Sequence, residues 1–201
     1  MASLDRRHFL KLAGAGSLAL TIPDRLRGDQ NVGSPPNMIV VLVDDMRWDD
    51  IGITGHPFVE TPNIDRVARE GAQLLNAFAA SPLCSPSRAS FLTGLYPHTN
   101  GIVDNVERGN ESQRLRTFPQ ALQRAGYETA FIGKWHMGPE ESDGTYGIDE
   151  IQIIGKSQDR SIGRDNDLFT AAIEFITANK DGPFYVNIWG HATHFPVNTP
   201  P

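Results

Sequence analysis

The run from Met38 to Val43 constrains the fold more than any other feature of the sequence, because all six of its residues are apolar and most are β-branched. Continuous runs of this kind are typical of strands in parallel sheets, which are buried on both faces. A strand buried on both faces needs helices above and below it. The run therefore predicts a central strand of an α/β fold.

Helical and strand patterns alternate along the rest of the chain. Thr61 and Pro62 supply a cap and a first-turn proline for a helix that extends to Gly71. We also expect helices at Phe118–Ala125 and Asp167–Ala178, and strands at Leu74–Ala79, Thr129–Ile132 and Phe184–Trp189. This order predicts a three-layer α/β/α fold with a mostly parallel central sheet. Ligands of such folds bind at the carboxyl ends of the strands.

Two adjacent carboxylates, Asp44 and Asp45, follow the first predicted strand directly. Adjacent carboxylates repel each other unless a cation or several donors neutralise them, and oxygen ligands suit Ca²⁺ or Mg²⁺. A pair of aspartates at a turn can equally be solvated caps. Asp49 and Asp50 lie further along, where we expect a loop.

Cys84 is the single cysteine of the chain, so it cannot form an internal disulfide. Ser85 suits the cap of a helix, Pro86 its first position and Gly94 its left-handed end. This places the thiol at a helix N-terminus, which favours an anion. Arg88, one turn into the helix, can reach the same anion. The alternative is a buried free cysteine at a turn.

Basic side chains follow two other predicted strands. Lys134 and His136 come after the strand that ends at Ile132, and His191 and His194 come after the last predicted strand. A lysine and a histidine on a surface loop would be the alternative. The two later histidines lack a neighbouring cysteine or carboxylate in sequence, which makes them weak candidates for zinc ligands.

These motifs together resemble one family, the type I sulfatases. The run Cys84-Ser85-Pro86-Ser87-Arg88, with its continuation Leu92-Thr93-Gly94, is similar to the first family signature, and Gly133-Lys134-Trp135-His136-Met137-Gly138 is similar to the second. The Asp44-Asp45 pair and the run from His191 to Pro196 occur in the expected order. The resemblance covers Asn37 to Pro196 and implies an alkaline phosphatase-like α/β fold and a sulfuric ester hydrolase.

The resemblance assigns a role to each catalytic candidate. It implies that a maturation enzyme oxidises Cys84 to formylglycine, whose hydrate attacks sulfur. Arg88 and Lys134 would stabilise the transferring sulfate, and His194 would bind the sulfate and protonate the leaving alcohol. His136 would help to regenerate the aldehyde, and sulfate would leave by C–O cleavage. We expect His191 to support this site, and Pro97–Gly101 to be structural or to form a wall of the site.

The metal site implied by the resemblance consists of Asp44, Asp45 and the modified Cys84, with Ca²⁺, or else Mg²⁺, as the ion. In the family an Asp-Asn pair and another lysine come from the later half, and this sequence ends before them. We therefore expect the N-terminal portion of a sulfatase. By itself it should bind metal poorly and have little or no activity.

Composition narrows the range of partners. The formal net charge of −6 argues against nucleic acid, since a phosphate-backbone binder would normally be basic. The contents of 39% hydrophobic and 21% charged residues fit a globular domain. The substrate implied by the family is a sulfated carbohydrate, small or polymeric, or else an aryl sulfate.

The first 28 residues differ from the rest. Arg6-Arg7-His8-Phe9-Leu10-Lys11 precedes an uncharged stretch from Leu12 to Ile22 that is too short for a stable membrane span. The pattern resembles a twin-arginine export signal, although Asp5 stands where Ser or Thr is usual. It implies the twin-arginine translocase as a partner and a periplasmic or secreted protein. Residues 29–36 then form a linker, and 37–201 the catalytic portion.

Two other functions fit the same motifs. A phosphonate monoester or phosphodiester hydrolase of the same superfamily can use a Cys-x-Pro-x-Arg run. A non-catalytic fragment that binds anions or sugars would keep Cys84 as a thiol. The chemical state of Cys84 and the choice between sulfate and phosphate esters separate these possibilities.

Overall fold

The computed structural model describes residues 34–106, 115–138, 142–155, 163 and 165–195. The fold belongs to the compact unit that begins at Pro36. The predicted export signal and most of the predicted linker lie outside the described residues. Within those residues, no helix has the length and apolar character needed to cross a membrane.

Within the described part of the chain, four parallel strands form the central sheet, in the order β1-β4-β2-β3. Their bounds are Met38–Val43 for β1, Glu128–Gly133 for β2, Glu150–Gln152 for β3 and Phe184–Gly190 for β4. In the register, Val43 pairs with Gly190 and Gly133 pairs with Trp189. The carboxyl ends of β1, β4 and β2 therefore meet at one edge.

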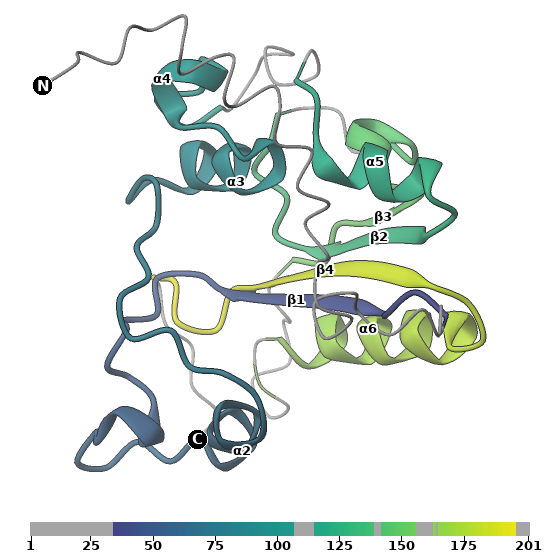
Figure 1. Cartoon of the computed structure of the whole chain (residues 1–201). Coiled ribbons are helices and arrows are strands. Elements are labelled where there is room, and N and C mark those ends of the chain that lie inside the picture. The colour runs from purple at the N-terminus through teal and green to yellow at the C-terminus, as the bar shows by residue number, and fades with distance from the viewer. Residues whose placement is uncertain (1–33, 107–114, 139–141, 156–162, 164, 196–201) are drawn as a thin grey trace, which may run out of the picture. The chain divides into compact units, whose positions relative to one another are not determined.

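Helices cover both faces of the sheet, which confirms the α/β prediction (Figure 1). On one face, α6 (Asn166–Asn179) packs Leu168, Ala172 and Phe175 against apolar residues of β2 and β4. On the other face lie α3 (Cys84–Thr93) and α5 (Phe118–Arg124). Ala89 and Leu92 of α3 join a second buried cluster around Phe131 and Trp189. The sheet thus has an apolar core on each side.

The remaining elements are short and lie in the connections. They are the 3₁₀ helices η2 (Gly52–Thr54) and η4 (Thr145–Gly147), and the helices α2 (Pro62–Glu70) and α4 (Pro97–Asn100). The buried Asn100 side chain donates to Ser90 Oγ and to the Leu95 carbonyl oxygen. Those bonds tie α4 to α3, which is a structural role for this segment.

Two strand predictions were wrong. β1 has the predicted bounds, but among the described residues it lies at an edge of the sheet, with Ile39 and Val41 49% and 51% exposed. Their partners in the register, Val186 and Ile188, lie on the α6 face, and α6 packs against β4 and β2 rather than β1. The segment Leu74–Ala79 forms no strand, because no other strand pairs with its backbone.

The start of α3 also differs from the prediction. Leu83, not Ser85, is the N-cap residue, so Cys84 is the first residue of the helix. The Ser85 hydroxyl instead donates to the His136 carbonyl oxygen at 2.7 Å. The end of the helix is as predicted, with Gly94 in the left-handed conformation at φ 68°. A tertiary contact therefore uses the side chain that local sequence assigns to the cap.

Gly133 allows β2 to end close to β4. Its φ is +117°, and a Cβ atom there would lie 2.2 Å from the Trp189 carbonyl oxygen and 2.5 Å from Leu168 Cδ1. Only glycine tolerates both the backbone conformation and this approach. The next residue, Lys134, donates its backbone N–H to the same Trp189 oxygen at 2.9 Å. The glycine therefore places Lys134 directly beside the end of β4.

We expect Gly133→Ala to lower the free energy of unfolding by about 3 kcal/mol, through overpacking and a strained φ. Urea denaturation of both proteins measures the change. Gly182→Ala is the matched control, because a Cβ at Gly182 meets no atom within 4 Å. Equal stabilities of the two variants would contradict the close approach of β2 and β4.

Candidate active site

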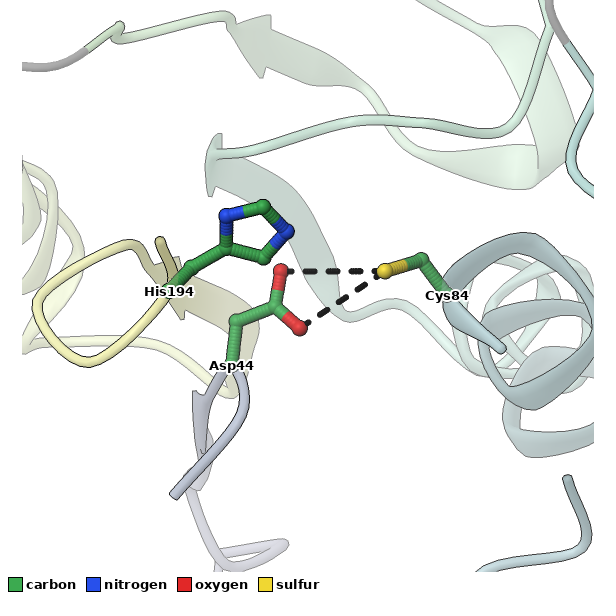
Figure 2. A group of neighbouring side chains, drawn as sticks. All are labelled: Asp44, Cys84 and His194. Carbon is green, nitrogen blue, oxygen red and sulfur yellow. Dashed lines mark hydrogen bonds between the residues drawn. The ribbon is translucent and has the colours of Figure 1, made fainter. Parts of the chain in front are cut away.

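The predicted site residues converge at the carboxyl edge of the sheet. Asp44 follows β1, Lys134 follows β2 and His194 follows the turn after β4, while Cys84 begins α3. Figure 2 shows the side chains of Asp44, Cys84 and His194 pointing toward one another from three separate segments. The tertiary structure thus brings together residues that are far apart in sequence.

The Asp44 carboxylate is the centre of the charge arrangement. Its Oδ2 atom accepts hydrogen bonds from Arg88 Nη2 at 3.1 Å and from Lys134 Nζ. Burial acts to raise the pKa of Asp44, but the hydrogen bond from Lys134 and the charges of Arg88 and Lys134 outweigh it. The pKa consequently lies below its ordinary value of 3.8. Asp44 is therefore a carboxylate at neutral pH.

Arg88 is a cation buried in the core, with 1% of its surface exposed. Besides Asp44, its Nη1 atom donates to the Lys134 carbonyl oxygen at 2.5 Å, and its guanidinium carbon lies 4.4 Å from the centre of the Trp189 ring. Burial lowers the pKa of Arg88, while the charge of Asp44 acts in the opposite direction. An arginine remains charged under such conditions. Arg88 of α3 thus places a fixed positive charge in the core.

Cys84 lies next to the charged groups of Asp44 and Lys134. Its Sγ atom is 3.7 Å from Asp44 Oδ1 and 3.7 Å from Lys134 Nζ. The neighbouring Ser85 fixes the start of α3, because its hydroxyl also accepts the Val106 N–H at 3.1 Å. These bonds hold the thiol at a set position relative to the loop that carries Lys134.

Asp45 and His136 adopt left-handed backbone conformations, with φ values of 61° and 51°. Among the described residues only Tyr146 is a further non-glycine residue with positive φ. Such conformations cost about 1 kcal/mol or more and cluster at functional sites. Asp45 Oδ2 lies 3.7 Å from His194 Nε2. His136 and Lys134 line a hollow of about 440 Å³ that also includes His191.

The ligand chemistry at this edge fits a hard cation in part. One ligand atom each from Asp44, Cys84 and His194 lie within 4.8 Å of one another. Asp44 and Cys84, together with Asp45 and Met46, line a hollow of about 320 Å³. Ca²⁺ takes six to eight oxygen ligands. Asp44 and Asp45 supply carboxylates of the right kind, and oxygen in place of the Cys84 sulfur would add another.

Some acidic residues near β1 lie apart from this arrangement. Asp49 pairs with the exposed Arg47 at 2.7 Å, and Asp50 lies 3.7 Å from His56 Nε2. Both are in the loop, where the sequence places them.

Asp165 is a buried residue near the site that sequence reasoning missed. Its carboxylate accepts the backbone N–H groups of His191 and Ala192, at the end of β4. The hydroxyl of Thr193, another residue not predicted, donates to the Asp44 carbonyl oxygen. In the sequence, an aspartate just before a helix is indistinguishable from an ordinary helix cap, so no local signal marked it.

The family model for sulfatases matches residues 36–201, which is most of the chain. The chain belongs to the sulfatase family. The family accounts for the order of the motifs and for the parallel sheet with helices on both faces.

Curated relatives are themselves sulfatases. This sulfatase chain is 41% identical to human N-acetylgalactosamine-6-sulfatase in an alignment of 138 residues that covers 61% of the chain and 26% of the relative. It is 39% identical to N-acetylglucosamine-6-O-sulfatase of Bacteroides thetaiotaomicron over 134 residues, 67% of the chain and 23% of the relative. The chain thus spans about a quarter of the length of these relatives.

Solved structures share its fold. The PsFucS1 sulfatase from Pseudoalteromonas sp. matches with a TM-score of 0.73 and 25% identity, over 89% of this chain and 48% of that one. The structure of BT4656 in complex with its substrate D-glucosamine-2-N,6-O-disulfate matches with a TM-score of 0.66 and 32% identity, over 80% and 35%. The fold is therefore alkaline phosphatase-like, as the sequence predicted.

We expect Asp44→Asn to change how stability depends on pH. The pKa of Asp44 is lowered in the folded state, so its contribution is present above its ordinary value of 3.8 and is lost as pH falls through the folded pKa. At neutral pH the variant leaves two cations without their carboxylate and loses about 3 kcal/mol of unfolding free energy.

Urea denaturation across a range of pH values measures this difference. The wild type should lose stability more steeply than Asp44→Asn as pH falls below 3.8. Asp181→Asn, at an exposed aspartate after α6, is the control. Parallel curves for the wild type and Asp44→Asn would contradict the charge arrangement.

Proposed function

We propose that the protein hydrolyses sulfate esters of carbohydrates with a formylglycine nucleophile made from Cys84. The observation that carries the proposal is the placement of two cations beside the thiol. Lys134 Nζ lies 3.7 Å from Cys84 Sγ. The Arg88 guanidinium and the Lys134 ammonium both pair with the Asp44 carboxylate. Fixed cations beside a nucleophile are what a transferring anionic group requires.

The roles of the side chains follow from their positions. After oxidation and hydration, Cys84 would supply the hydroxyl that attacks sulfur, in a covalent mechanism. Arg88 and Lys134 would stabilise the charge on the sulfate oxygens. His194, whose ring lies beside Asp44 and Cys84 (Figure 2), would donate a proton to the leaving alcohol. His136 would accept the proton that is lost when the aldehyde re-forms.

A bound metal would complete the charge balance. We propose that Asp44, Asp45 and the modified Cys84 contribute ligands to Ca²⁺, or else Mg²⁺. When bound, such an ion polarises an oxygen of the sulfate. Lys134, which follows β2, and His194, in the turn after β4, would bind the sulfate group.

The names of the relatives support an amino-sugar sulfate as the substrate. Two are N-acetylgalactosamine-6-sulfatase and N-acetylglucosamine-6-O-sulfatase, and BT4656 was crystallised with a glucosamine disulfate. Steryl-sulfatase of human is also 41% identical, over 55% of the chain. We therefore propose a carbohydrate 6-sulfate as the first substrate to test and an aryl sulfate as the general one.

The first test is the chemical state of Cys84. Expressed with a formylglycine-generating enzyme, the chain should show exchange of the thiol for an aldehyde in peptide mass spectra over residues 81–95. Cys84→Ala is the control. Arg88→Ala should reduce conversion of the thiol to the aldehyde, because the maturation enzyme recognises the run from Cys84 to Arg88. An intact thiol in the wild type would favour a non-catalytic anion-binding protein.

The second test is turnover by the protein expressed from its complete reading frame. We expect hydrolysis of N-acetylgalactosamine 6-sulfate and of an aryl sulfate, none by Cys84→Ala, and about a hundredfold lower kcat/KM for Lys134→Ala. A phosphodiester assayed in parallel separates the rival activity. Faster turnover of the phosphodiester than of either sulfate would contradict the proposal.

We also propose that residues 1–28 are a twin-arginine signal, that 29–36 are a linker and that 37–201 are catalytic. The protein would then be exported to the periplasm or beyond by the twin-arginine translocase. Residues 1–36 fused to a reporter should direct it to the periplasm, and replacing Arg6 and Arg7 together with lysine should abolish export. Cell fractionation measures this, and export of the lysine variant would contradict it.

A further inference from the structure

Asp165 occupies the N-cap position of α6, but its side chain makes no hydrogen bond to its own helix. An aspartate at this position usually accepts an N–H from the first turn of the helix, which stabilises the helix. Here the carboxylate turns away from the helix. It accepts the His191 N–H at 2.8 and 2.9 Å and the Ala192 N–H at 2.8 Å.

The contact between Asp165 and the end of β4 is buried and close. Asp165 is 8% exposed and His191 7%, and His191 Nδ1 lies 3.5 Å from Asp165 Oδ1. Burial acts to raise the pKa of Asp165, but the hydrogen bonds from His191 and Ala192 hold it below its ordinary value. A Cβ atom at Gly190 would lie 2.6 Å from Asp165 Oδ2. The glycine thus leaves room for the carboxylate.

The anchored residues begin the turn that carries His194. The His194 N–H donates to the His191 carbonyl oxygen at 2.9 Å and closes the turn. On its other side, the Thr193 hydroxyl donates to the Asp44 carbonyl oxygen. The turn is therefore fixed to α6 at its start and to β1 near its end. The His194 imidazole projects from it toward Asp44 and Cys84 (Figure 2).

We propose that Asp165 is a positioning residue that holds the turn from His191 to His194, and with it the His194 imidazole, in place for proton transfer to the leaving alcohol. This inference rests on the proposed function, in which His194 is the proton donor. Without Asp165, two backbone N–H groups at the start of the turn lose their acceptor. The turn then moves so that these N–H groups can hydrogen-bond to water, and His194 loses its fixed position.

The proposal predicts a dependence on the leaving group. A sugar hydroxyl is a poor leaving group and needs a proton in the transition state, whereas a nitrophenol leaves as a stable anion and needs it much less. Loss of His194 positioning should therefore slow hydrolysis of a sugar sulfate much more than that of 4-nitrophenyl sulfate. A general loss of folded protein would lower both rates equally.

The kinetic test uses Asp165→Ala and Asp165→Asn in the protein expressed from its complete reading frame. For N-acetylgalactosamine 6-sulfate we expect kcat to fall about a hundredfold in Asp165→Ala, with less than about a tenfold fall for 4-nitrophenyl sulfate and little change in either KM. Asp165→Asn keeps one acceptor oxygen and should be intermediate. Asp181→Asn, at the other end of α6, should match the wild type.

A double variant separates positioning from other effects. His194→Ala should show the same selectivity between the two substrates, and adding Asp165→Ala to it should cause little further loss, because both changes remove one function. Equal losses on both substrates in Asp165→Ala, or full additivity with His194→Ala, would overturn the proposal.

Hydrogen exchange on the 201-residue chain gives a readout that does not need turnover. In Asp165→Ala and Asp165→Asn, the amides of residues 191–194 should exchange at least about tenfold faster, while those of β2 stay protected. Unchanged exchange in the turn, or faster exchange throughout the domain, would overturn the proposal. A wild type that hydrolyses neither substrate would refute the proposed function, and exchange would still decide whether Asp165 holds the turn.

Discussion

The structure of the site depends on one buried interaction, the sharing of the Asp44 carboxylate by Arg88 and Lys134. The three residues come from β1, α3 and the end of β2, so their charges link three elements. A buried charge without a partner is costly, and here the Asp44 carboxylate compensates both cations, while the two cations stabilise the buried carboxylate. The Trp189 ring and the Lys134 carbonyl oxygen complete the surroundings of Arg88. The same charges lie beside the Cys84 sulfur, so the arrangement that stabilises the core also provides the environment for an anion.

A second anchor acts on the other side of the site. Asp165 fixes the start of the turn after β4, and Thr193 fixes its end to the backbone of Asp44. The Asp165 carboxylate and the Thr193 hydroxyl each hydrogen-bond to the backbone of a different element instead of their own. Asp165 thus makes a tertiary contact in place of the local cap of α6. Such departures from local rules are expected at positions where geometry matters to function. The turn that carries His194 is thereby held beside Asp44 and Cys84.

Much of the fold was predictable because its strands and helices are strongly patterned. The apolar run Met38–Val43 and the runs that became β2 and β4 signal strands without help from other parts of the chain, although β1 proved to be a partly exposed edge strand among the described residues. The three-residue β3 escaped prediction because Glu150, Ile151 and Gln152 carry too short a pattern. Leu74–Ala79 has the composition of a strand but pairs with none, and composition cannot show whether a pairing partner exists.

By itself the sequence determined the kinds of chemistry available: a lone cysteine at a helix start, a pair of aspartates, and basic residues after strands. It also determined that the aspartates and the basic residues lie at strand ends, because apolar runs stop where these polar motifs begin. Only the tertiary structure decided which of them meet. The register of β1, β4 and β2 places Asp44, Lys134 and the His194 turn at one edge, and the diverted carboxylate of Asp165 holds that turn. Such contacts join residues far apart in the chain, and their energy comes from burial and pairing that no local pattern encodes.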